Sequence, residues 1–253
     1  MITDDFHLSG KTAIVTGCDT GLGQGMAVAL AEAGADIVGV NIVAPTETIA
    51  KVEALGRRFV SIEANLMKQD DIPQIVDTAV REFGKIDILV NNAGIIRRED
   101  AVDFSEKDWD DVMNINIKSV FFLSQAVARR FIEQGHGGKI INVASMLSFQ
   151  GGIRVPSYTA SKSGVMGITK LLANEWAHHG INVNAIAPGY MATNNTAALR
   201  ADEERSNEIL GRIPAARWGL PRDLAGPAVF LASDASSYVN GYTIAVDGGW
   251  LAR

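Results

Sequence analysis

Tyr158 and Lys162 are the two side chains whose types and spacing best suit proton-transfer chemistry. They stand four residues apart in a segment of helical period, so both side chains should share one helix face. A phenol with its ordinary pKa of about 10 is a poor base near neutral pH, but a neighbouring ammonium group lowers that pKa. We predict that Tyr158 acts in general acid–base catalysis and that Lys162 tunes it. Because many helices contain this spacing by chance, the surroundings must support the prediction.

Those surroundings are small residues, which allow a cofactor or a second backbone to approach: Ala160, Ser161, Ser163 and Gly164. Ser145 follows an apolar run, at the kind of strand end where α/β sheets gather ligands. Its hydroxyl can hydrogen-bond a substrate carbonyl. A turn or cap role is the alternative for a serine judged without Tyr158.

Two asparagines, Asn114 and Asn116, interrupt an otherwise apolar helical run. The amide of asparagine competes with backbone hydrogen bonding, which makes it a poor residue for a helix interior. Such local violations are expected at functional or strained sites. An exposed polar face is the alternative, above all for Asn114.

The glycine-rich segment Thr16–Gly23 follows the first predicted strand and opens a helix. Glycines allow a tight turn and let backbone N–H groups approach a pyrophosphate, while the helix N-terminus adds partial positive charge. In this position the segment predicts a dinucleotide site. The small residues of Asn91–Gly94 close the fourth predicted strand and would let it pass near a flat ligand, although an ordinary turn is the alternative.

The end of the second predicted strand bears on the choice between NAD and NADP. An acidic residue there binds ribose hydroxyls, whereas an arginine accepts the 2′-phosphate of NADP. The corresponding residue is the neutral Asn41, and no lysine or arginine occurs between Lys11 and Lys51. Asp19 would repel a phosphate mildly. We therefore predict NAD.

Apolar runs and segments of helical period alternate along the chain. Runs that are apolar throughout are typical of strands buried on both faces of a parallel sheet. The predicted strands are Lys11–Thr16, Ile37–Val43, Phe59–Ala64, Ile86–Asn91, Lys139–Ala144, Asn182–Ala187 and Thr243–Val246. The predicted helices are Gly23–Ala33, Pro45–Leu55, Asp70–Phe83, Ser105–Gln134, Ser157–His179 and Asp223–Leu231. This alternation predicts a single α/β domain over 1–253, a doubly wound parallel sheet of about seven strands.

The polar stretch around 190–220 breaks this alternation after a strand end. A solvated surface helix and a mobile substrate lid are both consistent with it.

Composition excludes several classes of protein. The net charge of −6 argues against nucleic-acid binding, which needs a basic surface. Cys18 is the single cysteine, so no disulfide forms within the chain, and a reducing compartment fits. The N-terminus lacks the pattern of a signal peptide, and no apolar run reaches the roughly 18 residues of a membrane span. We expect a cytoplasmic protein.

Together these motifs resemble those of the short-chain dehydrogenase/reductase family, over essentially the whole chain. The matching motifs are Thr16-Gly-x-x-x-Gly21-x-Gly23, Asn91-Asn-Ala-Gly, Ser145, Tyr158-x-x-x-Lys162 and Pro188-Gly189. The resemblance implies direct hydride transfer to or from a nicotinamide without a metal. Ser145 would orient the substrate oxygen and Tyr158 would exchange its proton. Lys162 would hold the ribose, and Asn116 would position a water in a proton relay.

The resemblance also implies the residues of the cofactor site. They are Gly17, Asp19, Gly21, Leu22, Gly23, Asn41, Asn65, Leu66, Asn92, Ala93, Gly94, Tyr158, Lys162, Pro188, Gly189 and Thr193. Asn41 and Asn65 depart from the acidic residues that members often carry at these places, which puts the strength of adenosine binding in question.

A narrower resemblance is to members that act on hexuronate-derived keto acids in pectin and alginate breakdown. Such a substrate needs a cation for its carboxylate, ideally a guanidinium. Arg154 is the first choice, ahead of Arg97 and Arg98, with surface ion pairs as the alternative for each. The predicted substrate contacts are Ser145, Gln150, Arg154 and Tyr158, with Ser148 and Asn194 as further hydroxyl partners.

Two other functions compete with this one. A reductase of carrier-bound 3-oxoacyl chains would share the catalytic motifs but would call for a basic docking patch and an arginine for NADPH. A non-catalytic nucleotide sensor would have lost Ser145, Tyr158 or Lys162. The family also implies a homotetramer, packed through apolar residues such as Val120, Phe121, Phe122, Met166 and Leu171. The apolar tail residues Trp250 and Leu251 favour an interface too.

Overall fold

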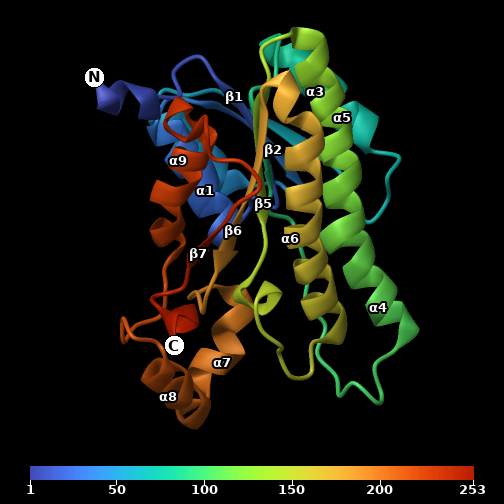
Figure 1. Ribbon diagram of the computed structural model, residues 1–253, viewed down its shortest axis with the longest axis vertical. Helices are drawn as coiled ribbons and strands as arrows, with labels where there is room; N and C mark the ends of the chain where they lie inside the picture. Colours follow the sequence, from blue (N-terminus) through green and yellow to red (C-terminus); the bar gives the residue numbers. More distant parts are fainter.

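Seven parallel strands form one sheet in the computed structural model, which describes all residues from Met1 to Arg253 (Figure 1). The strand order is β3-β2-β1-β4-β5-β6-β7. The strands are β1 (Thr12–Thr16), β2 (Asp36–Asn41), β3 (Phe59–Glu63), β4 (Ile88–Asn91), β5 (Gly138–Val143), β6 (Ile181–Pro188) and β7 (Thr243–Val246). The order reverses between β1 and β4. Ligands of open α/β sheets bind at such a switch point, beyond the carboxyl ends of the strands.

The predicted fold class is confirmed, and each predicted strand lies within two residues of its observed bounds. The reason is burial: every residue of β1 and every residue of β4 is buried. A strand covered on both faces has apolar residues throughout, so its sequence is distinctive.

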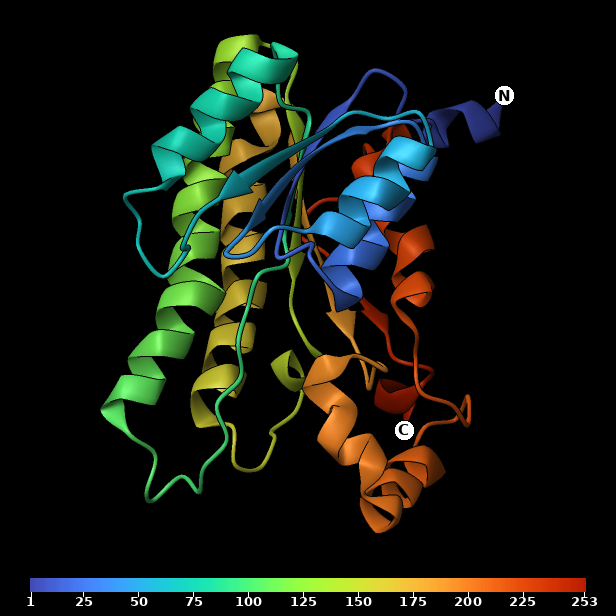
Figure 2. The ribbon, with the colours of Figure 1, turned by 180° about the vertical axis from the view of Figure 1, so that it is seen from behind.

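Helices cover both faces of the sheet. They are α1 (Gly21–Glu32), α2 (Thr46–Ala54), α3 (Ile72–Phe83), α4 (Glu106–Met113), α5 (Ser119–Gln134), α6 (Pro156–Trp176), α7 (Ala197–Ala201), α8 (Glu203–Arg212) and α9 (Ala225–Ala232). Figures 1 and 2 show α1, α2 and α9 on one face and α3, α5 and α6 on the other. None of the helices combines the length and the apolar character that crossing a membrane requires.

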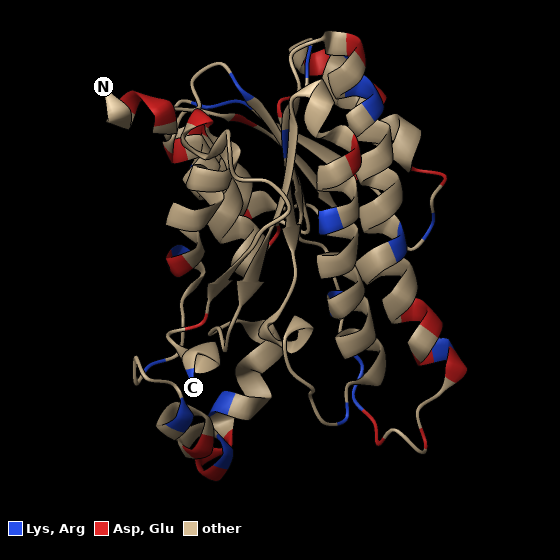
Figure 3. Ribbon diagram, viewed as in Figure 1, with Lys and Arg blue, Asp and Glu red and all other residues tan.

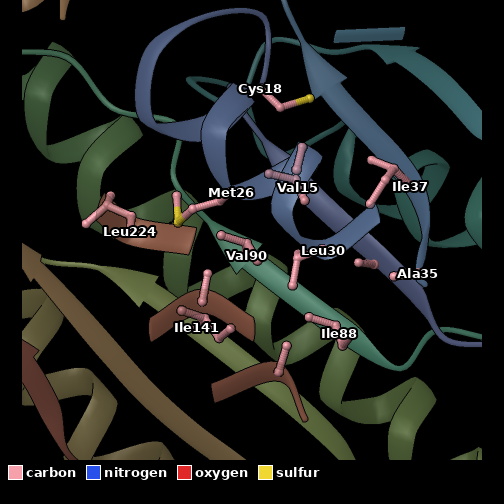
Figure 4. Close-up of a cluster of buried hydrophobic side chains, with 14 of the residues drawn as sticks. Val15, Cys18, Met26, Leu30, Ala35, Ile37, Ile88, Val90, Ile141 and Leu224 are labelled. Atoms are coloured by element: carbon pink, nitrogen blue, oxygen red, sulfur yellow. The ribbon is translucent and has the colours of Figure 1, made fainter. Parts of the chain in front are cut away.

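Each face of the sheet has its own hydrophobic core. In β1, Val15 belongs to the core beneath α1 and α9, together with Met26 and Leu30 (Figure 4). Its neighbour Ile14 belongs to the core on the opposite face, with Leu123 of α5. Successive side chains of a strand point to opposite faces, so one strand serves both cores. The carboxyl ends of the strands are thereby held on a rigid base.

The predicted helix Ser105–Gln134 is wrong as a single α-helix. It consists of α4, a π-helical turn over Asn114–Lys118, and α5. The pattern of apolar residues continues through the turn, which explains why the prediction joined the two helices. Such π-turns are rare and frequently occur at functional sites.

Candidate active site

The carboxyl ends of the strands gather the four predicted catalytic side chains. Ser145 follows β5, Tyr158 and Lys162 lie in α6, and Asn116 lies in the π-turn. The Lys162 Nζ atom is 5.8 Å from the centroid of the Tyr158 ring. At Gly94, an added Cβ would lie 3.1 Å from Asn116 Oδ1 and 3.7 Å from Lys162 Nζ. The loop after β4 therefore contacts the same group of side chains.

Tyr158 is poised to hold a proton. Removal of water by the surrounding pocket raises the pKa of its phenol. A hydrogen bond with the Ser145 hydroxyl and the positive charge of Arg98 oppose that rise. The phenol is consequently protonated near neutral pH and can donate to an oxygen bound beside Ser145.

Lys162 is a buried cation that no carboxylate accompanies. Its side chain is 4% exposed, and its Nζ donates to the Val143 carbonyl over 2.6 Å. Burial lowers the pKa of this ammonium group to about 8, so it is charged at neutral pH. The β5 carbonyl fixes the group at the strand end, within reach of a ligand there.

Asn116 joins the π-turn to the loop after β4. Its Oδ1 accepts the Ile95 N–H and its Nδ2 donates to the Ile95 carbonyl, both over 2.9 Å. The same Nδ2 donates to the Ser161 hydroxyl over 3.2 Å, which connects it to α6. Asn116 is wholly buried. Its amide thus satisfies backbone groups that a regular strand end would leave free.

The sequence suggested that Ser148 contacts the substrate, but in the structure its hydroxyl has a structural role. Its hydroxyl donates to the Lys162 carbonyl over 2.6 Å and accepts the Ser145 N–H over 3.3 Å. The side chain therefore ties the loop that carries Ser145 to α6. The other suggested contacts lie nearer to solvent, with Gln150 half-buried and Asn194 exposed.

The glycine loop has the shape that a dinucleotide requires. Gly17 and Gly21 have φ values of +62° and +58°, in the left-handed region that favours glycine. A Cβ at Gly23 would lie 2.0 Å from the Gly17 carbonyl oxygen. No side chain caps the first amides of α1, whose N-cap is Thr20. Those amides are free to bind a pyrophosphate, so the residues present fit the cofactor.

The segment after β4 braces this loop. The Asn92 amide donates to the carbonyls of Thr16 and Gly17, over 3.0 and 2.8 Å. The Thr16 hydroxyl accepts the backbone N–H groups of Asn92 and Ala93. These hydrogen bonds therefore hold the loop after β1 and the loop after β4 together.

Asn41 is buried and faces the loop. Its Oδ1 accepts the Cys18 N–H over 2.7 Å, and Thr48 donates to the Cys18 carbonyl over the same distance. Sequence reasoning missed Thr48, because only the fold brings α2 to the loop. Burial also raises the pKa of the Cys18 thiol to about 11, which keeps it protonated.

Three other predicted cofactor residues have different surroundings. Leu66 is buried in the core beneath α3 and α5, and Asn65 accepts the Met67 N–H. Leu22 packs against the core beneath α1. Thr193 lies in the stretch that follows β6, which ends at Pro188. A Cβ added at Gly21, in the glycine loop, would lie 3.6 Å from the Thr193 side chain. The stretch after β6 therefore reaches the glycine loop.

The three arginines near the site have different partners. Arg154 pairs with Glu99 and Asp100, at 3.4 and 3.1 Å. Arg97 pairs with Asp108 at 3.3 Å. Arg98 forms no ion pair within 4.0 Å, and its charge acts on Tyr158. The sequence ranked Arg154 first, and of the three arginines only Arg98 has no ion pair.

The stretch around 190–220 forms two short helices, α7 and α8, beside the strand ends (Figure 2). A parallel bridge between Met191 and Gly219 closes its base. Charged residues of both signs cover α8 (Figure 3). This arrangement agrees with a charged side of α8 that faces water and an opposite side that faces the site. No group of three or more His, Cys, Asp or Glu side chains is arranged to hold a metal ion.

Comparison with known proteins gives three full-length similarities. Residues 17–251 match a family model described as enoyl-(acyl carrier protein) reductase. The chain is 78% identical, over all of both chains, to 2-dehydro-3-deoxy-D-gluconate 5-dehydrogenase of Escherichia coli K12. It is 57% identical to the enzyme of that name from Bacillus subtilis, over 99% of this chain and 98% of the relative.

A solved structure from Agrobacterium tumefaciens has the same fold. It is assigned as a 2-deoxy-D-gluconate 3-dehydrogenase and contains bound NADP. Its identity to this chain is 55%, its TM-score is 0.94, and the match covers 99% of this chain and 100% of that one.

Proposed function

The chain belongs to the short-chain dehydrogenase/reductase family, and from that premise we propose that it interconverts 2-dehydro-3-deoxy-D-gluconate and the corresponding 2,5-diketo acid, with NAD as cofactor. The observation that carries the proposal is the exposed Arg98, which forms no ion pair and whose positive charge lowers the pKa of the Tyr158 phenol. A proton-transfer group together with an unpaired guanidinium suits a substrate that is both an alcohol and a carboxylate. The relatives of 78% and 57% identity bear the name of this reaction.

The chain's residues supply everything in this reaction except the hydride acceptor. A bound nicotinamide would supply hydride transfer to or from the alcohol carbon. Ser145 orients the substrate oxygen, and Tyr158 accepts the proton of the hydroxyl in oxidation or donates one in reduction. Lys162 stabilises the phenolate electrostatically and holds the ribose, since its ammonium group has no competing carboxylate.

Asn116 would guide the proton onward. Its amide is fixed between Ile95 and Ser161, beside the loop that Lys162 approaches. Held in this way, it can order a water between the lysine and solvent. The relay would return Tyr158 to its starting protonation state after each turnover.

Arg98 would bind the substrate carboxylate. A planar guanidinium matches a carboxylate with two parallel hydrogen bonds, and such charge-assisted bonds are stronger than neutral ones. The side chain also donates to the Asn195 carbonyl over 3.4 Å, which connects it to the stretch after β6. Substrate would therefore meet the loop after β4 and the base of α7 together.

We propose that NAD is preferred over NADP, although the Agrobacterium structure contains NADP. The end of β2 offers the neutral Asn41 and then the exposed apolar residues Ile42 and Val43. The nearest lysine in sequence, Lys51, pairs with Glu47 at 2.6 Å. No free cation on this strand end can compensate a 2′-phosphate. Rates with NADH and NADPH at equal concentration test the preference, and faster turnover with NADPH would contradict it.

A reductase of carrier-bound acyl chains is the competing function, and the name of the matching family model points that way. That enzyme needs an apolar channel for its acyl chain, whereas the positive charge of Arg98 is felt at the Tyr158 phenol. The near full-length relatives named for a sugar acid also favour the first function.

We also propose that the protein forms a homotetramer through α5 and α6. The apolar residues expected at this contact divide into two groups: Val120 is buried in the core, whereas Phe122 and Leu171 are about 40 to 50% exposed. A groove between the two helices is lined by Phe121, Ile132, Leu171 and Trp176, among other residues. An apolar groove on an outer helix layer fits a self-complementary contact with a second copy.

A panel of substrates tests the proposed function. Purified protein with NAD should oxidise 2-dehydro-3-deoxy-D-gluconate, with formation of NADH followed by absorbance. Aldonic acids should be slower, and uncharged sugars of the same length should give negligible rates because they cannot engage Arg98. A higher specificity constant for an uncharged sugar or a carrier-bound 3-oxoacyl chain would overturn the proposal.

A further inference from the structure

The C-terminal residues Asp247–Arg253 lie against the far end of the α7–α8 stretch. Figures 1 and 2 both place the C-terminus beside these helices. The Arg253 guanidinium donates to the Gly211 carbonyl over 3.0 Å. The Arg212 guanidinium stacks 4.2 Å from the centroid of the Trp250 ring. The tail is therefore part of the surroundings of α8, within the same chain.

Trp250 is the centre of a separate hydrophobic cluster. It is 4% exposed and packs with Ile209, Ile213 and Met146. Ile209 belongs to α8, whereas Met146 directly follows Ser145. The Tyr190 ring, just beyond β6, lies edge-on to Trp250 with centroids 4.8 Å apart. The Trp250 ring thus connects α8 to two loops of the site, the loop that follows Ser145 and the loop that follows β6.

The backbone brings Trp250 into this position. Gly248 and Gly249 both have positive φ, +66° and +91°, which turns the chain sharply after β7. A Cβ at Gly248 would lie 2.9 Å from the Ile213 side chain, so the two segments touch. The Ala215 N–H donates to the Gly248 carbonyl over 2.9 Å. The end of α8 is fastened to the tail by packing and by a hydrogen bond.

The other end of the stretch is held less firmly. No residue of α7 is buried; Leu199 packs half-buried against the Trp250 cluster, and the Arg200 side chain reaches back to the Thr193 carbonyl. Removing the tail contact would therefore leave α8 without a buried anchor, since Ile209 is the one buried residue of that helix.

We propose that Trp250 is a positioning residue that holds α8 over the substrate pocket and so determines the affinity for the sugar acid. It does this through packing alone, because its indole N–H has no hydrogen-bond partner within the chain. The inference rests on the proposed function for the identity of the substrate, but not for the position of α8. The proposal also explains why the C-terminal residues are apolar. They pack within the same chain, whereas the sequence suggested that they form an interface with another copy.

The experiment compares Trp250→Ala with Trp250→Phe, which keeps an aromatic ring. Trp109→Ala is the matched control, since Trp109 lies in α4, is 40% exposed and takes no part in the cluster. Limited digestion with trypsin reports on the lid independently of activity, because Arg200, Arg205 and Arg212 lie in α7 and α8. Cut sites are identified by mass spectrometry, and NADH titration checks that the cofactor site is intact.

Trp250→Ala should be cut faster within 200–212 and should raise KM for the sugar acid about tenfold, which corresponds to about 1.4 kcal/mol of binding free energy. Its kcat should change less than its KM, and its affinity for NADH should match that of the wild type. Trp250→Phe should restore both properties, and Trp109→Ala should leave both unchanged. Wild-type protection of 200–212 in Trp250→Ala would overturn the proposal. Faster cutting in a protein that oxidises no sugar acid would instead contradict the proposed function alone.

Discussion

At the scale of single residues, the site depends on charges held without counterions. Lys162 rests on a backbone carbonyl, and Arg98 has no carboxylate within ion-pair distance. Burying a cation such as Lys162 is unfavourable unless something compensates it, whereas the exposed Arg98 is hydrated. We expect a bound ribose to accept hydrogen bonds from Lys162 and a substrate carboxylate to pair with Arg98.

Replacing Arg98 by Gln should weaken binding of the carboxylated substrate. Losing a charged hydrogen bond costs about 1.5–3 kcal/mol, so KM should rise roughly tenfold to a hundredfold. Activity on an uncharged analogue should change little. Arg154→Gln is the control, because Arg154 already pairs with Glu99 and Asp100 in an exposed position where such pairs contribute little. Equal effects of the two substitutions on KM would contradict the assignment.

The rate of oxidation should depend on pH through two groups. Oxidation requires Tyr158 to lose a proton, and its pKa is raised, so the rate should climb as pH rises from neutral. The pKa of Lys162 is lowered to about 8, so its charge is present below that pH and is lost above it. The climb should therefore flatten near pH 8 in a profile of kcat/KM.

The variant Lys162→Arg separates these two effects. A guanidinium stays charged throughout this range, so the flattening near pH 8 should disappear even if the absolute rate falls. If the profile of the variant kept its bend near pH 8, another group would be responsible.

At the scale of elements, the first strand, the glycine loop and α1 act as one unit. The fit of Gly23 against the Gly17 carbonyl leaves no room for a side chain. Gly23→Ala should abolish detectable NADH binding in a fluorescence titration. Gly226→Ala in α9 is the control, because a Cβ there meets nothing within 4 Å and should leave NADH affinity unchanged. Unchanged affinity in both variants would refute the predicted pyrophosphate site.

The sequence predicts elements well where burial is uniform. β1 and β4 are recognisable because all their residues face a core. The π-turn was not predictable, since it follows from tertiary hydrogen bonds of Asn116 to Ile95 and Ser161. The asparagine itself was the visible signal, as a residue unsuited to a helix interior.

The same contrast holds for the site. Ser145, Tyr158 and Lys162 were identifiable because motif order and residue chemistry agree. The role of Arg98 was not, because the choice among three arginines depends on which carboxylates the fold places beside each. Thr48 was missed, and the structural role of Ser148 was not foreseen, for a related reason. Their hydroxyls bond to backbone carbonyls that are distant in sequence.

At the scale of the whole molecule, the sheet separates a buried scaffold from a site built of loops. We expect the exposed apolar groove between α5 and α6 to pair with a second copy. Leu171→Asp should place a charge in that contact, and light scattering should then show a smaller assembly than the wild type. Lys170→Asp is the control for charge, as an exposed neighbour outside the groove. A wild-type molecular mass for Leu171→Asp would contradict the proposed interface.

The central claim is that Tyr158 transfers the proton in oxidation of a sugar acid. The most direct measurement is turnover of 2-dehydro-3-deoxy-D-gluconate with NAD by the wild type and by Tyr158→Phe, which removes the phenolic hydroxyl and keeps the ring. We predict that the variant binds NADH normally but loses at least about 10²-fold in kcat, the typical contribution of general acid–base catalysis. Near-normal turnover by Tyr158→Phe would contradict the account.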